Sequence, residues 1–401
     1  MRKLNLEQEM AIHPSITAPK ITKDYMPLVP IEKMGRNELC WCRSGKKHKK
    51  CHLIREGQEK SNVFEHEQKM WAELREGYCS HPAPSPDNPC SATIAKAHTI
   101  QKNGGLAAIS EDGHILTVKP VMKEMIKTEG NPQPRRVGVG NASVFPGFCS
   151  NHDSALFKAV EGKSLALTRE TAFLFSYRAI AYERFSKEAQ HRFTSYLREA
   201  DRGMPFWKQA ALQKLLYDMI TGLEIGVRDV NRWKKQFDDR LLSGTLDDFH
   251  FVAIRFDRIL PIVACGAFHP EFDLKGTRLQ QLGQDKFELD HVTLTVTTFA
   301  ENTVVVFGWI GPHSGPSRAL AESFLAVDDS RKADALVRLL FIHTDNVFLR
   351  PSWWATLPAS SQKILNNMTR SGTHMRMRTG EEFADASLRF FSADVAETAS
   401  G

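Results

Sequence analysis

Cysteine is gathered into two stretches of the chain, and this restricts the fold more than any other feature of the sequence. The chain has seven cysteines, and all but Cys265 lie in one of the two stretches, each of which also contains histidine. Clustered Cys and His in a chain without a secretory signal are typical of metal ligands, whereas a secreted disulfide framework spreads its cysteines along the chain. The sequence therefore predicts two zinc sites, with Cys265 as a small buried apolar residue.

The first stretch holds four ligand-type side chains within a short span. Cys40 and Cys42 are followed, after a basic turn, by Cys51 and His52. Three thiolates and one imidazole are sufficient to close a tetrahedral zinc site. These four residues are therefore predicted to bind one structural zinc ion.

This stretch resembles the SEC-C motif, first described at the C-terminus of the SecA translocase ATPase, where it binds zinc and serves as a docking module. Trp41 stands where proline is usual and Arg43 where glycine is usual, and neither is a ligand. The matching residues, besides the four ligands, are Gly35, Arg36, Asn37, Ser44, Gly45, Lys46, Lys47, Lys49 and Lys50.

The lysines of this stretch, Lys46, Lys47, Lys49 and Lys50, form a compact positive segment. Such a segment can bind the phosphates of RNA or DNA, with Trp41 available for base stacking. The motif also carries these lysines when its partner is a protein, so the same residues equally indicate a docking surface or a solvated face. Both interpretations stay open.

The second stretch has two half-sites separated by a long insert. Cys79 and Cys90 stand at its front, and Cys149 and His152 at its back. Cys149 and His152 share one face of a helical turn if a helix begins near Cys149. These four residues predict a second structural zinc site, for which His81 competes with Cys79 or Cys90 as a ligand.

The layout of this second stretch resembles the His-Asn-His (HNH) nucleases, the ββα-metal group built on a treble-clef zinc scaffold. In that family a histidine ends the first strand, an asparagine lies in the following loop, and a third residue begins the helix beside the zinc ligands. His98, Asn141 and Asp153 occupy these places here. The resemblance implies that His98 activates water as a general base, that Asn141 orients it, and that Asp153 helps to hold Mg or Mn at the scissile phosphate.

The same residues also fit a purely structural interpretation. His98 is then an ordinary strand-end histidine, Asn141 a turn residue and Asp153 a carboxylate at a helix N-terminus. The segment becomes a zinc-stapled interaction module without a reaction. Arg135 and Arg136 lie in a basic, proline-rich loop that can contact a phosphate backbone.

Hydrophobic periodicity predicts an α+β multidomain protein with a small zinc motif, a treble-clef zinc unit, a long helical hairpin and an antiparallel sheet covered by helices. Short strands are expected at 106–109 and 114–118, and a β-hairpin at 292–310. Helices are expected at 330–342 and 353–368. The predicted segments are a flexible arm (1–32), the SEC-C zinc motif (33–57), a linking helix (58–77), the treble-clef/HNH-like unit (78–162), the helical hairpin (163–245), an α+β domain (246–384) and a tail without order at its end (385–401).

Composition narrows the function classes only slightly. A net charge of +6 is compatible with nucleic acid, and 42% hydrophobic residues indicate an ordinary globular protein. No apolar run is long enough for a membrane span and the N-terminus lacks a secretory signal, so a cytoplasmic protein is expected.

Together these features favour an HNH-like, zinc-containing endonuclease of DNA or RNA, with a role in phage defence suggested by analogy alone. The alternative is a non-enzymatic adaptor for a protein or ribonucleoprotein, so whether the chain is an enzyme stays open. The apolar seam of the long hairpin also admits a homo-oligomer.

Overall fold

The computed structural model describes residues 28, 34–119, 133–162, 165–282, 288–312, 315–369, 377–384 and 387–401. The expected N-terminal arm, apart from Leu28, lies outside these residues. The chain divides into two compact units, and the first contains residues 28, 34–76 and 186–229 of the described chain. The second unit contains the rest, and each unit is described by itself.

The first unit packs α2 (Val63–Glu73) and the SEC-C stretch against parts of α5 (Arg169–Tyr196) and α6 (Phe206–Ser243). The linking helix expected from the sequence is thus confirmed as α2, and the side chain of Asn62 caps it by accepting from Phe64 N at 3.0 Å. The seam between α5 and α6 is filled by the chain's own apolar side chains, namely Phe193, Leu197, Ala200, Leu212, Leu215 and Leu216.

The second unit is built on an eight-stranded sheet in which every neighbouring pair is antiparallel. The expected hairpin is confirmed, and Ala300 makes its tight turn with φ 51°. The strands, in spatial order, are β10 (Val395–Ser400), β5 (Phe249–Phe256), β8 (Asn302–Ile310), β7 (Val292–Phe299), β6 (Ile262–Phe268), β9 (Val347–Leu349), β2 (His114–Thr117) and β3 (Arg135–Gly138).

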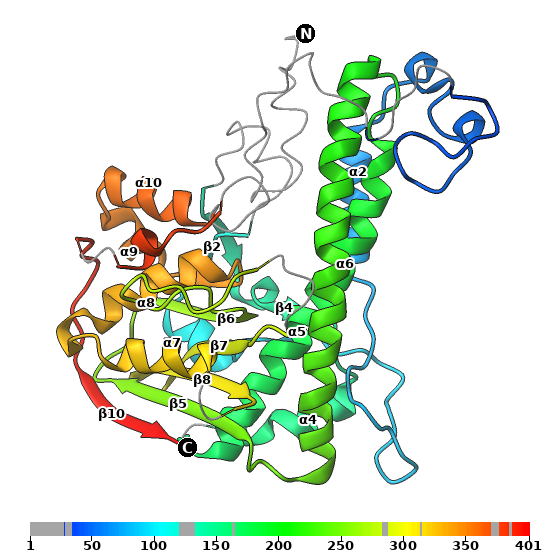
Figure 1. Cartoon of the computed structure of the whole chain (residues 1–401). Helices are drawn as coiled ribbons and strands as arrows, with labels where there is room; N and C mark the ends of the chain where they lie inside the picture. Colours follow the sequence, from blue (N-terminus) through cyan, green and yellow to red (C-terminus); the bar gives the residue numbers. More distant parts are fainter. Residues whose placement is uncertain are drawn as a thin grey trace. The chain divides into compact units, whose positions relative to one another are not determined.

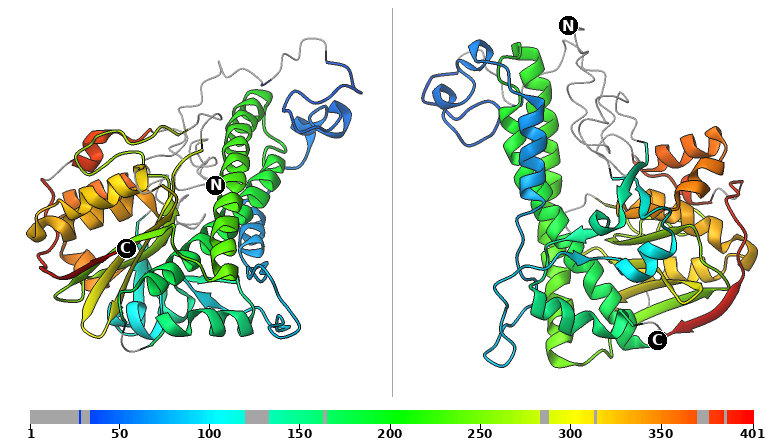
Figure 2. Two further views of the ribbon diagram at one scale, coloured as in Figure 1. Left: turned by 60° about the horizontal axis from the view of Figure 1, so that its bottom comes forward. Right: turned by 180° about the vertical axis from the view of Figure 1, so that it is seen from behind.

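Helices cover both faces of this sheet (Figures 1 and 2). Along β5, Val252, Ile254 and Phe256 pack toward one set of helices, while Phe249 and Phe251 pack toward α5 and α6 on the other face. This alternation is the period of two expected of a strand buried on both sides. The first set comprises α7 (Pro316–Leu325), α8 (Asp329–His343), α9 (Pro351–Thr356), α10 (Ala359–Met368) and α11 (Gly380–Ala384). The mixed α+β class with an antiparallel sheet is confirmed.

A smaller element of the second unit combines a two-stranded sheet with a helix. Strands β1 (Ala97–His98) and β4 (Val144–Phe145) pair antiparallel, and α4 (Ser150–Phe157) follows β4. The segment between β1 and β4 contains β2 and β3, which belong to the eight-stranded sheet. Phe145 and Phe148 pack in one apolar cluster with Phe173 and Tyr177 of α5, so the small element lies on the α5 face of the sheet.

Three local expectations were wrong. Instead of a strand at 106–109, a π-helical turn covers Lys102–Leu106; here Gly105 lies so close to β7 that an added Cβ would come within 2.6 Å of Thr297 Oγ1. The helix expected at 353–368 is broken into α9 and α10, because Pro358 cannot donate a backbone hydrogen bond and begins a new helix as its N-cap. The C-terminal end has order, since β10 pairs with β5.

Candidate metal centres and the adjoining polar site

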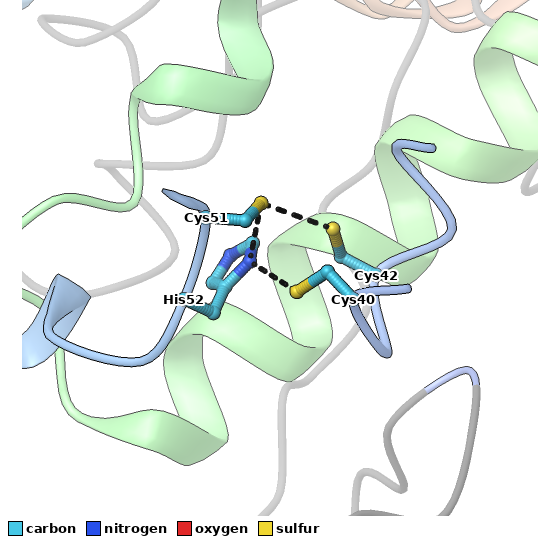
Figure 3. A group of neighbouring side chains, drawn as sticks. All are labelled: Cys40, Cys42, Cys51 and His52. Atoms are coloured by element: carbon cyan, nitrogen blue, oxygen red, sulfur yellow. Dashed lines mark hydrogen bonds between the residues drawn. The ribbon is translucent and has the colours of Figure 1, made fainter. Parts of the chain in front are cut away.

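The first Cys/His cluster brings its four side chains together within 4.8 Å of one another (Figure 3). Nδ1 of His52 lies 3.2 Å from Cys40 Sγ and 3.1 Å from Cys51 Sγ, and Cys42 Sγ lies 3.6 Å from Cys51 Sγ. All four residues are buried. Three sulfurs and one imidazole nitrogen at these separations form the donor set of a structural zinc site.

A carboxylate behind the imidazole orients it toward the sulfurs. Nε2 of His52 donates to Asp201 Oδ2 at 2.8 Å, and both side chains are almost fully buried. When the neutral ring keeps its proton on Nε2, Nδ1 presents its lone pair to the cysteines, which is the tautomer that a metal needs. Asp201 is itself held by Gln213 Nε2 at 2.8 Å and by Arg55 Nε at 3.3 Å.

Trp41 is part of the core beneath this cluster. Its side chain is 1% exposed, and its ring lies 4.5 Å from the His52 ring and 5.4 Å from the Phe206 ring. The expectation that Trp41 is available for base stacking is therefore wrong, because the departure from the usual proline fills the space between the motif and α6.

The lysines of the first cluster lie on its outer surface. Lys46, Lys47, Lys49 and Lys50 are all exposed, and Lys46 forms an ion pair with Glu199 at 3.2 Å. Apolar side chains are exposed in the same motif, with Leu39 68% and Ile54 64% exposed. The surface is thus both positive and apolar.

The second Cys/His cluster assembles Cys79, Cys90, Cys149 and His152 within the same 4.8 Å limit. Nδ1 of His152 lies 3.4 Å from Cys79 Sγ, 3.6 Å from Cys90 Sγ and 3.1 Å from Cys149 Sγ. Nε2 of His152 donates to the backbone carbonyl of Asn88 at 3.2 Å. A carbonyl oxygen can only accept, so Nε2 is the donor and Nδ1 is the ring nitrogen that faces the sulfurs, and the residues present fit a zinc ion.

His81 lies beside the second cluster but outside its donor set. Its ring stacks on the His152 ring at 3.9 Å, nearly parallel at 8°. The four residues that the sequence singled out come together without it, and His81 packs against a ligand-type side chain.

The start of α4 favours the thiolate form of Cys149, which is the N-cap residue of this helix. Burial raises the pKa of this thiol, but hydrogen bonds from the backbone amides of His152 and Ser91, together with those of the Ser91 and Cys79 side chains, lower the pKa to about 6. A thiolate at neutral pH is the form that binds zinc.

A buried lysine holds the loop that carries Cys79. Nζ of Lys234 donates to the backbone carbonyl of Ser80 at 2.8 Å and to Tyr177 Oη at 2.9 Å. Its charge is balanced by Asp238, with which it forms an ion pair four residues along α6. Helices α5 and α6 thereby support the front half-site of the second cluster.

His98 and Asp153 lie at the places expected from the sequence, at the end of β1 and in the first turn of α4. Nε2 of His98 and Oδ1 of Asp153 are both buried and have no hydrogen-bond partner among the described residues. Burial lowers the pKa of His98, and the charges of Lys102 and Arg178 lower it further. Burial raises the pKa of Asp153, against the opposing charge of Arg178. Arg178 thus acts on both side chains.

The remaining predicted site residues are more exposed. Asn141 ends the 3₁₀ turn η4 (Val139–Asn141) and makes no hydrogen bond to His98, both residues being described. Its orienting role stays a prediction. Arg135 and Arg136 lie in β3, not in a loop, and Arg136 is 55% exposed, 3.9 Å from Asp112.

Over the described part of the chain, only these two Cys/His clusters bring three or more His, Cys, Asp or Glu ligand atoms within 4.8 Å of one another. His98 and Asp153 therefore do not form a ready-made multi-carboxylate metal site. Among the same residues, no helix combines the length and the apolar character needed to cross a bilayer.

Comparison with known protein families matches residues 36–53 to the SEC-C motif. The match includes all four side chains of the first cluster, and SEC-C is a zinc-binding motif. No curated protein and no solved structure matches the chain.

Asp201 and Arg178, which contact or surround the candidate sites, were not identified from the sequence. Asp201 follows the end of α5 in a charged turn, and nothing local connects it with His52. Arg178 does leave a signal, because it interrupts an otherwise apolar part of α5 between Tyr177 and Ala179.

Proposed function

We propose that this chain is a metal-dependent nuclease whose hydrolytic site adjoins the second Cys/His cluster. The observation that carries the proposal is the pair of buried polar atoms, Nε2 of His98 and Oδ1 of Asp153, that lack hydrogen-bond partners in the described residues. Leaving a buried polar group unpaired costs about 1–3 kcal/mol, and this cost is relieved when a ligand or an ordered water supplies the missing partner.

The position of the pair agrees with the ββα arrangement. His98 ends β1, β1 pairs with β4, and Asp153 follows His152 in α4. A single zinc-bound scaffold would then fix both the strand end and the helix start. A treble-clef scaffold in the strict sense remains a prediction.

His98 is suited to accept a proton. Because burial and two nearby cations lower its pKa, the imidazole is neutral at pH 7 and can take a proton from an attacking water. Asn141 would orient His98, as the resemblance to the HNH nucleases implies.

Asp153 would share in holding Mg or Mn. Mg is commonly held by one or two carboxylates together with water and substrate phosphates, so one carboxylate is compatible with such a site. When bound, the cation supplies charge stabilisation at the phosphate and the leaving oxygen. His98 and Asp153 would keep their places through the zinc cluster next to them.

Cleavage assays with the purified full chain test the proposal. Plasmid DNA and structured RNA are incubated with Mg or Mn, and His98→Ala is compared with the wild type. His114→Ala is the matched control, because His114 is an exposed histidine of the same unit. Cleavage that is lost in His98→Ala, retained in His114→Ala and accompanied by unchanged zinc content supports the nuclease. Equal cleavage by His98→Ala overturns it.

A second candidate function, docking of a protein partner, rests on the outer surface of the SEC-C motif. Exposed lysines stand together with exposed Leu39 and Ile54, while Trp41 is buried and unavailable to bases. Such a surface suits an acidic and apolar protein segment better than single-stranded nucleic acid, which needs exposed rings. On this proposal the motif recruits the partner and the second unit acts on nucleic acid.

The cellular setting remains a prediction. A cytoplasmic protein agrees with thiolates held by zinc, and a role in phage defence follows from analogy with nucleases that carry accessory domains.

A further inference from the structure

Arg178 is the most deeply buried charge close to His98 and Asp153. Its side chain is 2% exposed, although it belongs to α5 and not to the small β1–β4–α4 element. The guanidinium lies over the Phe157 ring at 3.9 Å, and Nη2 donates to Glu161 Oε1 at 2.6 Å. Stacking on a ring of α4 fixes the plane of the guanidinium.

The guanidinium of Arg178 has an N–H donor that no acceptor among the described residues uses. An arginine carries five N–H donors, and Nε of Arg178 is buried without a partner among the described residues. Its carboxylate partner, Glu161, is 41% exposed and therefore free to turn toward solvent. Stability alone does not favour burying a cation against a half-exposed carboxylate, because desolvation of the cation is costly.

Arg178 lies close to the residues of the proposed site. Its guanidinium stacks on Phe157 of α4, the helix whose first turn carries Asp153, and its charge lowers the pKa of His98. Lys102, which is exposed, adds a second positive charge near His98. The surroundings of His98 are thus positive although Asp153 and Glu161 are present.

We infer that Arg178 is the anion-binding residue of this site: its guanidinium holds a non-bridging oxygen of a phosphodiester beside His98, and Glu161 occupies the guanidinium when no phosphate is bound. This inference rests on the proposed function for the reaction but not for the binding of phosphate. Arginine suits this task because its planar fork matches two phosphate oxygens. When a phosphate replaces the Glu161 carboxylate, the buried charge of Arg178 stays paired with an anion.

This exchange predicts that substitutions at Arg178 and Glu161 change the affinity for nucleic acid in opposite directions. Arg178→Met removes the binding group, so affinity for a nucleic acid falls. Glu161→Gln removes the competitor, so affinity rises. An arginine with a merely structural role gives a different pattern, because both substitutions then lower the stability of the fold and leave affinity unchanged.

The experiment measures binding of a fluorescein-labelled DNA oligonucleotide to the full chain by anisotropy, together with kcat and KM for cleavage in Mg or Mn. The variants are Arg178→Met, Arg178→Lys and Glu161→Gln. Arg258→Met is the control for net charge, since Arg258 is an exposed arginine of the same unit paired with Asp257. Zinc content and circular dichroism verify each fold.

The expected result is a loss of affinity of about tenfold or more in Arg178→Met, corresponding to one charge-assisted hydrogen-bonded contact. Arg178→Lys is expected to be intermediate, and Glu161→Gln to bind more tightly than the wild type. In cleavage, kcat of Arg178→Met falls by about 10²-fold, since the contact strengthens as charge develops on the phosphate. Arg258→Met behaves as the wild type.

The outcomes separate the inference from the proposed function. Cleavage by the wild type with unchanged binding and kcat in Arg178→Met overturns the inference and leaves the nuclease standing. Opposite affinity changes in Arg178→Met and Glu161→Gln, without cleavage by any protein, establish the anion site and overturn the nuclease. Absence of oligonucleotide binding by the wild type overturns both. If Arg178→Met does not fold, the affinities of Arg178→Lys and Glu161→Gln test the inference instead. The inference is overturned if both variants bind the oligonucleotide as tightly as the wild type does.

Discussion

Asp201→Asn tests how the first Cys/His cluster obtains its metal affinity. Oδ2 of Asp201 accepts from His52 Nε2 and from Gln213 Nε2, each at 2.8 Å, and Oδ1 faces Arg55 Nε at 3.3 Å. All three neighbours are donors. Whichever way the introduced amide turns, its NH₂ group meets a donor, and His52 loses a charged acceptor.

The magnitude follows from these contacts. A hydrogen bond to a charged group contributes about 1.5–3 kcal/mol and a neutral one about 0.5–1.5 kcal/mol, so the loss at His52 is roughly 1–2 kcal/mol. Since about 1.4 kcal/mol is tenfold in an equilibrium constant, zinc affinity should fall about 5- to 30-fold. The protein should remain folded when zinc is in excess, because the apolar core of this unit is unchanged.

Glu199→Gln is a matched control for this experiment. Glu199 also pairs with Arg55, at 2.6 Å, but it does not contact His52. The control removes one negative charge from the same arginine and leaves the imidazole orientation intact. Zinc affinity is measured by competition with a chromophoric chelator. If both variants bind zinc equally well, the orienting role assigned to Asp201 is refuted.

Three further predictions follow from named contacts. Cleavage should lose activity as pH falls, because His98 is then protonated. Since the pKa of His98 is lowered, this acidic limb of the kcat/KM profile should lie below the ordinary histidine pKa of about 6.5. Lys102→Gln removes a charge that lowers this pKa and should move the limb to higher pH. Trp41→Ala should lower the free energy of unfolding by about 3–5 kcal/mol in urea titrations, whereas exposed Leu39→Ala should change it by less than about 0.5 kcal/mol. Replacing Lys47, Lys49 and Lys50 by Gln should reduce the salt slope of oligonucleotide binding by about 0.9 per lysine that touches phosphate; an unchanged slope supports protein docking instead.

The metal clusters could be predicted from the sequence because their chemistry is carried by rare residue types. Cysteine and histidine are few, so pairs such as Cys40 with Cys42 and Cys149 with His152 stand out, and the structure brings each predicted group of four together. The long strands and helices were likewise visible, since β5 and β7 extend over several periods of their patterns.

The residues that complete each site could not be predicted in the same way. Asp and Arg are common, and the partner of Asp201 or Arg178 is decided by packing between distant segments. The error at Lys102–Leu106 has a similar origin, because a short apolar run fits either a strand or a helical turn until the neighbouring strand β7 is known. The strand β10 exists through its pairing with β5, and a polar tail gives no sign of this.

In both clusters Nδ1 of the histidine faces the sulfurs, but the acceptor that holds Nε2 lies at a different distance along the chain in each. His52 is oriented by a carboxylate 149 residues away, whereas His152 is oriented by the carbonyl of Asn88, which lies between Cys79 and Cys90. Metal-binding free energy contributes to folding where the metal joins segments. Zinc bound in the first cluster would join the two halves of the SEC-C motif, which carry Cys40 with Cys42 and Cys51 with His52. In the second cluster it would tie the loop of Cys79 and Cys90 to the first turn of α4, the turn that also carries Asp153, so zinc binding and the geometry of the proposed hydrolytic site would be coupled.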